Sequence, residues 1–191
     1  MTETVDIALE PLTAKAFAPY GQPIAARDEP PAFDVEHLDA WQMDFAVDGE
    51  IELMYARYIY QEMRWTTMER HFNITQSFMA LGGAASVMVV ADPTDVDDIS
   101  ILPQPATVRA FYVDGSRGVL LWRGTWHALT RFPVPAEGGA FAMITGAATQ
   151  QELERQNRDG THPVLTEVVN FEKAFGVGFA VTDPRGLLAG H

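Results

Sequence analysis

The chain of 191 residues contains no cysteine, which excludes disulfide bonds, a thiolate nucleophile and a cysteine-bound zinc site. Basic residues are also scarce, because 13 Lys+Arg stand against 26 Asp+Glu and leave a formal net charge of -13. That surplus of negative charge repels phosphate backbones, so we expect no nucleic-acid partner. No apolar run reaches the roughly 18 residues of a membrane-spanning helix, and the acidic N-terminus lacks a signal-peptide pattern. We therefore expect a cytoplasmic globular protein that does not enter a membrane.

Long helices are disfavoured by the 15 Gly and 12 Pro that interrupt the chain. Segments rich in β-forming residues recur about every 8–12 residues with turn signals between them, which is typical of an all-β sandwich or barrel. The expected strands cover 51–60, 65–81, 84–91, 107–113, 118–122, 126–132 and 140–145.

Helical patterns are short and few. The segment 13–18 predicts a helical turn with Thr13 as its N-cap, and 149–156 predicts a polar helix. We expect a single domain over 1–191, with a core at 8–148 and a polar helix and C-terminal extension at 149–191. Within that extension, 170–181 is expected to add an edge strand.

Two histidines lie within β-patterned runs and are the candidates for chemistry. Alternation along the strand around His71 places Glu69 and His71 on one face and Arg70 on the other. Gln76 follows five residues after His71, and His127 ends the run Gly124-Thr125-Trp126-His127.

This spacing resembles a degenerate cupin pattern, with Glu69, His71, Gln76 and His127 at the positions of the metal-binding residues. The resemblance implies an all-β fold, a cupin-like jelly-roll β-barrel with a few short helices, whose lumen receives these side chains. Two imidazoles and a carboxylate suit a divalent Ni, Mn, Fe or Zn ion, and Glu69, His71, Gln76 and His127 are its expected ligands. The alternative is that His71 packs in the core with a satisfied hydrogen bond.

Four sequence blocks are similar to the ureidoglycolate lyase family and occur in family order between residues 9 and about 146. They lie at 12–21, 68–91, 108–111 and 118–127. The resemblance implies a homodimeric β-barrel enzyme that splits ureidoglycolate into glyoxylate and urea in allantoin degradation. It does not require a tightly bound metal. The aromatic run 55–60 also favours a homodimer, because it would otherwise leave an apolar edge in water.

Departures from the family leave the substrate open. Phe72 stands where the family commonly has Pro, Leu120 where it has Asn, and Ala128 where it has His. Loss of an amide near a pocket can change specificity strongly. Two alternatives therefore remain: a metal-dependent cupin enzyme for a more apolar small organic acid, and a non-catalytic small-ligand-binding cupin.

Cleavage of ureidoglycolate needs a general base, a general acid and a cation for the substrate carboxylate. We expect Glu69 and His71 to form the acid–base pair and His127 to polarise the hydroxyl oxygen, directly or through a metal. Arg57 and Arg123 are the expected substrate-binding residues, because a guanidinium offers a two-pronged donor. Arg57 in an interface salt bridge is the alternative for that residue.

Overall fold

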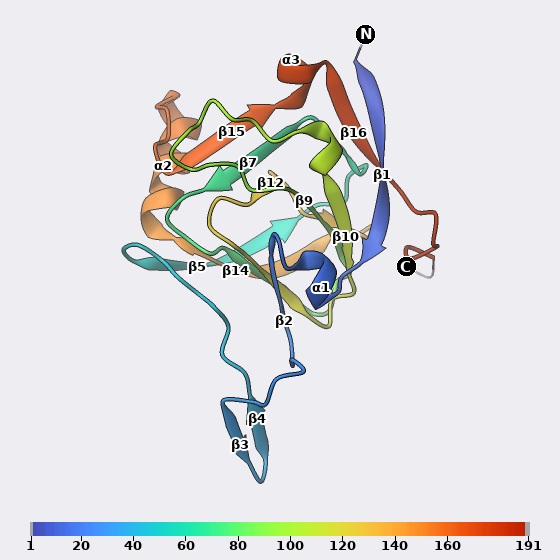
Figure 1. Ribbon diagram of the computed structural model, residues 1–191, viewed down its shortest axis with the longest axis vertical. Helices are drawn as coiled ribbons and strands as arrows, with labels where there is room; N and C mark the ends of the chain where they lie inside the picture. The colour runs from blue at the N-terminus through green and yellow to red at the C-terminus, as the bar shows by residue number, and fades with distance from the viewer. Residues whose placement is uncertain (1, 190–191) are drawn as a thin grey trace.

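The structure, a computed structural model, describes residues 2–189. Its strands and helices are spread along the whole of that range (Figure 1). The strands are β1 Glu3–Pro11, β2 Gly21–Ile24, β3 Phe33–Val35, β4 Leu38–Ala40, β5 Ile51–Tyr58, β6 Arg64–Trp65, β7 Thr67–His71, β8 Ser77–Leu81, β9 Ser86–Ala91, β10 Arg109–Val113, β11 Gly118–Leu121, β12 Trp126–Ala128, β13 Phe132–Pro133, β14 Gly139–Gly146, β15 Thr166–Asn170 and β16 Val177–Thr182. The α-helices are α1 Ala14–Phe17, α2 Ala147–Asp159 and α3 Phe171–Phe175, and a 3-10 turn covers Pro105–Thr107.

Two curled sheets make up the body of the protein. Within the described residues, the larger sheet has nine strands in the order β15-β7-β12-β9-β10-β1-β16-β6, with β13 also paired to β9. The smaller sheet has five strands in the order β2-β11-β8-β14-β5. The expected all-β class is confirmed, and the two facing sheets agree with a cupin-like barrel. The third sheet is the β3–β4 hairpin, which projects away from the body in Figure 1.

Strand β9 shows how the core is organised. All six of its residues are buried, and the five from Val87 to Ala91 alternate between two hydrophobic clusters. Val87 and Val89 belong to a cluster that includes Trp126 and Phe179, whereas Met88 and Val90 belong to one with residues from both sheets. A strand covered on both faces is apolar throughout, which explains the continuous run Val87-Met88-Val89-Val90.

The helices that the sequence predicts are present. The Thr13 hydroxyl accepts a hydrogen bond from the Ala16 backbone N–H at 3.1 Å, which confirms Thr13 as the N-cap of α1. The expected polar helix is α2, which ends at Gly160 in a left-handed conformation. None of the helices in the described range combines the length and the apolar character of a membrane span.

The last part of the chain is built into the larger sheet. Strand β15 pairs antiparallel with β7, and β16 pairs parallel with β1. The expected edge strand at 170–181 is wrong in its position, because β16 lies between β1 and β6 and helix α3 occupies 171–175. The division into an 8–148 core and a 149–191 extension stays a prediction, and residues 1, 190 and 191 lie outside the described range.

Candidate active site

Strands β7 and β12 bring three candidate residues together. In their antiparallel pairing His127 lies directly opposite Glu69, so both side chains project from the same face, and His71 follows two residues along that face. The potential ligand atoms of Glu69, His71 and His127 all lie within 4.8 Å of one another. The two imidazole centroids are 5.2 Å apart.

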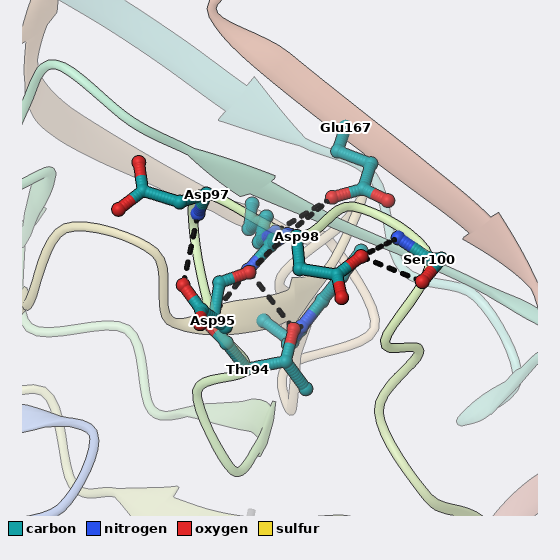
Figure 2. Close-up of polar contacts among 8 residues, drawn as sticks. Thr94, Asp95, Asp97, Asp98, Ser100 and Glu167 are labelled. Atoms are coloured by element: carbon teal, nitrogen blue, oxygen red, sulfur yellow. Dashed lines mark hydrogen bonds and ion pairs between the residues drawn. The ribbon is translucent and has the colours of Figure 1, made fainter.

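The opposite face of β7 has a structural role. Arg70 is fully buried there and donates hydrogen bonds to the Glu167 carboxylate and to the backbone oxygens of Thr94 and Asp95. These acceptors lie together in Figure 2, around the loop that follows β9. The guanidinium also stacks on Trp126 at 4.8 Å. The expected alternation, with Arg70 directed away from Glu69 and His71, is confirmed.

A small cavity of about 160 Å³ lies beside the three residues. Both sheets and helix α2 contribute to its wall, which consists of Tyr58, Glu69, His71, Gln76, Phe78, Met88, His127, Ala128, Leu129, Thr130, Arg131, Met143, Gln150 and Leu153. Pockets for drug-sized ligands span about 300–1,000 Å³, so this cavity fits a substrate with few non-hydrogen atoms.

Hydrogen bonds at Nδ1 fix how each imidazole is presented. His127 Nδ1 lies 3.1 Å from the carbonyl oxygen of Ala128, which can only accept, so Nδ1 carries the proton and Nε2 a lone pair. His71 Nδ1 lies 2.9 Å from the Thr166 hydroxyl on β15. Both Nε2 atoms are buried and have no hydrogen-bond partner in the described part of the chain.

Burial sets the protonation of all three groups. It raises the pKa of Glu69 to about 7 and lowers the pKa of His127 to about 4, with the nearby Arg131 charge adding to the latter shift. Burial and the neighbouring His127 also hold the pKa of His71 well below its usual value. His71 Nε2 and Glu69 Oε1 are 3.8 Å apart, but a neutral imidazole at that distance forms neither an ion pair nor a hydrogen bond.

The donor set fits a divalent metal. Two neutral imidazoles present Nε2 atoms without partners in the described range next to a carboxylate, and each imidazole is oriented through its other nitrogen, as is typical of histidine ligands. Gln76 lines the same cavity, and its Oε1 is also buried without a partner in the described range. The four expected ligands therefore surround one cavity.

Other expected residues lie elsewhere in the described structure. Arg57 is on the outer strand β5, and Arg123 pairs with Asp48 at 2.7 Å; neither lines the cavity. The structure therefore does not bring the expected substrate-binding arginines to the catalytic candidates. Leu120 is buried in β11 but does not contact the cavity either, so its difference from the family does not alter the wall, whereas Ala128 does contribute to it.

Two residues of the site were missed from sequence. Arg131 is buried in the cavity wall, and Thr166 orients His71 from a strand 95 positions away. Arg131 lies in the run Leu129-Thr130-Arg131-Phe132, but this context does not distinguish it from Arg57 and Arg123. No local signal points to Thr166, because its pairing with β7 is non-local.

The family model and the listed relatives in sequence agree on one family. The family model described as Ureidoglycolate lyase matches residues 4–164. The chain is 31% identical over 139 residues to "Ureidoglycolate lyase" of Rhodobacter capsulatus, covering 69% of this chain and 81% of the relative. It is 30% identical to the protein of that name from Azotobacter vinelandii, covering 63% and 74%, and 33% identical to that from Pseudomonas aeruginosa PAO1, covering 63% and 73%. Among solved structures, Bacillus subtilis oxalate decarboxylase, described with Mn(II) centres, aligns with a TM-score of 0.34 at 13% identity, covering 64% of this chain and 33% of that one.

Proposed function

Since the chain belongs to the ureidoglycolate lyase family, we propose that it cleaves ureidoglycolate to glyoxylate and urea in allantoin degradation, with Glu69, His71 and His127 as its reaction centre. The observation that carries this proposal is that the Glu69 carboxylate and the Nε2 atoms of His71 and His127 meet in a small cavity. Neither Nε2 atom has a hydrogen-bond partner in the described residues. The small cavity volume suits a substrate of this size.

The reaction requires two proton movements. The hydroxyl of ureidoglycolate loses its proton as the carbonyl of glyoxylate forms, the carbon–nitrogen bond breaks, and the ureido nitrogen gains a proton to leave as urea. Glu69 is suited to both transfers, because a pKa of about 7 populates its carboxylate and carboxyl forms near neutral pH. The carboxylate takes the hydroxyl proton, and the resulting carboxyl returns it to the leaving nitrogen.

The histidines contribute lone pairs to this scheme. With Nδ1 donating to Ala128, neutral His127 accepts a hydrogen bond at Nε2 and cannot donate one there. In this tautomer His127 has no proton at Nε2 with which to polarise the hydroxyl oxygen directly. The Thr166 hydroxyl holds the His71 ring, and when His71 Nδ1 donates to that hydroxyl, Nε2 can accept a hydrogen bond from the substrate.

Glu69, His71 and His127, with Gln76 as a further ligand, would hold a divalent Ni, Mn, Fe or Zn ion. Such an ion would supply Lewis-acid polarisation of a substrate oxygen.

A product assay tests the proposed activity. Purified protein incubated with ureidoglycolate should release glyoxylate and urea in equal amounts, without ammonia. Ammonia in place of urea would indicate hydrolysis of the ureido group instead of carbon–nitrogen lysis. Metal binding without glyoxylate release would favour an enzyme for another small acid, and neither signal would favour a binding protein.

A homodimer is also part of the proposal. Strand β5 is an edge of the smaller sheet in the described residues, and three of its four outward side chains are apolar: Ile51, Leu53 and Tyr55 are 58%, 73% and 70% exposed, and Arg57 is the fourth. An exposed apolar edge strand is a surface that a second copy would cover. The cytoplasmic location stays a prediction.

A further inference from the structure

Among the described residues, Arg131 is a buried cation without an acidic partner. Its side chain lies just before β13 and is 3% exposed, and it makes no ion pair with any acidic residue of the described range. Its Nη1 atom has no hydrogen-bond partner there either. The other deeply buried arginine, Arg70, has the Glu167 carboxylate at 2.6 Å. The fold therefore supplies a counter-ion to one buried guanidinium and none, within the described residues, to the other.

The groups around Arg131 are neutral. Nε and Nη2 lie 3.4 and 3.2 Å from the Ser86 hydroxyl, and the guanidinium stacks on the rings of Phe78 at 5.1 Å and Phe141 at 5.4 Å. Burial lowers the pKa of Arg131 to about 10, so the group stays charged at neutral pH. A buried charge that is not paired is costly, and the missing partner is expected to be an anion from outside the chain.

The carboxylate of Glu69 is not that partner. No ion pair joins the Glu69 carboxylate to Arg131 among the described residues, although both side chains line the same cavity. The Arg131 charge is nevertheless close enough to His127 to help lower the pKa of that imidazole. Arg131 and the three catalytic candidates thus line one cavity, with the cation and the carboxylate not in contact.

We propose that Arg131 binds the carboxylate of the substrate and makes the cavity selective for small carboxylates, an inference that rests on the proposed function for the identity of the acid. A guanidinium with a free Nη1 can donate to a carboxylate oxygen while Ser86 and the two phenyl rings hold its plane. With the substrate carboxylate bound at Arg131, the hydroxyl-bearing carbon would face Glu69 and the Nε2 atoms of the two histidines.

The test compares glycolate with glycolamide, two inert ligands of the same shape that differ in charge. Each is titrated at millimolar concentration into wild type, Arg131→Gln and Arg117→Gln, and binding is followed by calorimetry and by the shift in Tm. Arg117→Gln is the control, because it removes the same charge from a surface ion pair with Asp114. Wild type and Arg117→Gln should prefer glycolate about ten-fold or more, and Arg131→Gln should lose that preference. Equal binding of the two ligands by wild type, or a preference retained in Arg131→Gln, would overturn the proposal.

A stability measurement separates binding from a structural role. Arg131→Met keeps the contacts with Phe78 and Phe141 and removes an uncompensated charge, so its Tm should equal or exceed that of wild type. Arg70→Met should lower the Tm, because it leaves the Glu167 carboxylate without its ion-pair partner. A fall in Tm for Arg131→Met as large as that for Arg70→Met would show that Arg131 supports the fold and would overturn the proposal.

The same proteins distinguish the two levels of inference. In one outcome, wild type prefers glycolate through Arg131 but releases no glyoxylate from ureidoglycolate. That result would support the carboxylate site and refute the proposed reaction. In the other outcome, wild type releases glyoxylate and urea, and Arg131→Gln does so with an unchanged KM. That result would support the proposed reaction and refute the role of Arg131.

Discussion

Glu69 and His127 occupy opposite positions in the antiparallel pairing of β7 with β12. That register places a carboxylate against an imidazole on the inner face of the larger sheet, and His71 completes the group from two positions along β7. A shift of one residue in either strand would turn one of these side chains to the opposite face, where Arg70 lies. The site thus depends on strand register, and its geometry leads to the predictions below.

Thr166→Val should lower kcat about ten-fold or more. The change removes the hydroxyl that orients His71 through Nδ1 and keeps the size of a buried side chain. Steady-state kinetics with ureidoglycolate measure the effect, and Thr161→Val, in the loop before β15, is the control. Unchanged kcat in Thr166→Val would show that the imidazole does not need this contact.

Glu69→Gln should change how stability depends on pH in metal-free protein. The pKa of Glu69 is raised to about 7 from an ordinary 4.5, so the folded state binds more protons than the unfolded state between these values. Wild-type stability from this group is therefore present at low pH and lost as pH rises through about 7. The amide of the variant stays neutral at every pH, so the variant should gain up to about 3 kcal/mol on wild type between pH 5 and pH 8. Denaturant unfolding in EDTA measures the difference, and parallel stability curves would contradict the raised pKa.

A divalent metal should stabilise the wild type and not the ligand variants. An ion that binds only the folded state adds about 2.7 kcal/mol at 100 times its Kd. Added Mn, Fe, Ni or Zn should therefore raise the Tm of wild type in melting curves. The Tm of His71→Ala or His127→Ala should not rise. His162→Ala, an exposed histidine outside the cavity, should respond as wild type does. Equal responses in all four proteins would place any metal elsewhere.

Leu53→Glu should dissociate the proposed dimer. Leu53 is the most exposed of the apolar side chains on β5, and a charge there opposes burial against a second copy. Sedimentation at micromolar concentration should give about twice the 21.1 kDa chain mass for wild type and a monomer for the variant. Val164→Glu, at a similarly exposed position in a loop, is the control. A monomeric wild type would contradict the dimer.

Local patterns predicted the parts of the protein that local physics determines. The Thr13 cap, the polar helix α2 and the opposite orientations of Glu69 and Arg70 all depend on neighbours within a few residues. The meeting of His71 with His127 required more than alternation, and there the cupin-like spacing supplied the missing information.

Non-local pairing accounts for what the sequence did not predict. Strand β15 places Thr166 beside His71, and β16 enters the sheet between β1 and β6, through contacts that no short pattern encodes. The arginines show the same limit. Arg57, Arg123 and Arg131 all lie in or beside β-rich runs, and only the three-dimensional packing of Ser86, Phe78 and Phe141 distinguishes the one in the cavity.

The central claim is that this cavity cleaves ureidoglycolate with His71 at the reaction centre, and the most direct test is glyoxylate release by wild type and His71→Ala side by side. Wild type should release glyoxylate, and His71→Ala should turn over about 100-fold more slowly or worse while melting as a folded protein. Leu120→Asn, at a buried position outside the cavity wall, checks that a folded variant with an altered core keeps the reaction. A folded His71→Ala protein with wild-type turnover would contradict the account.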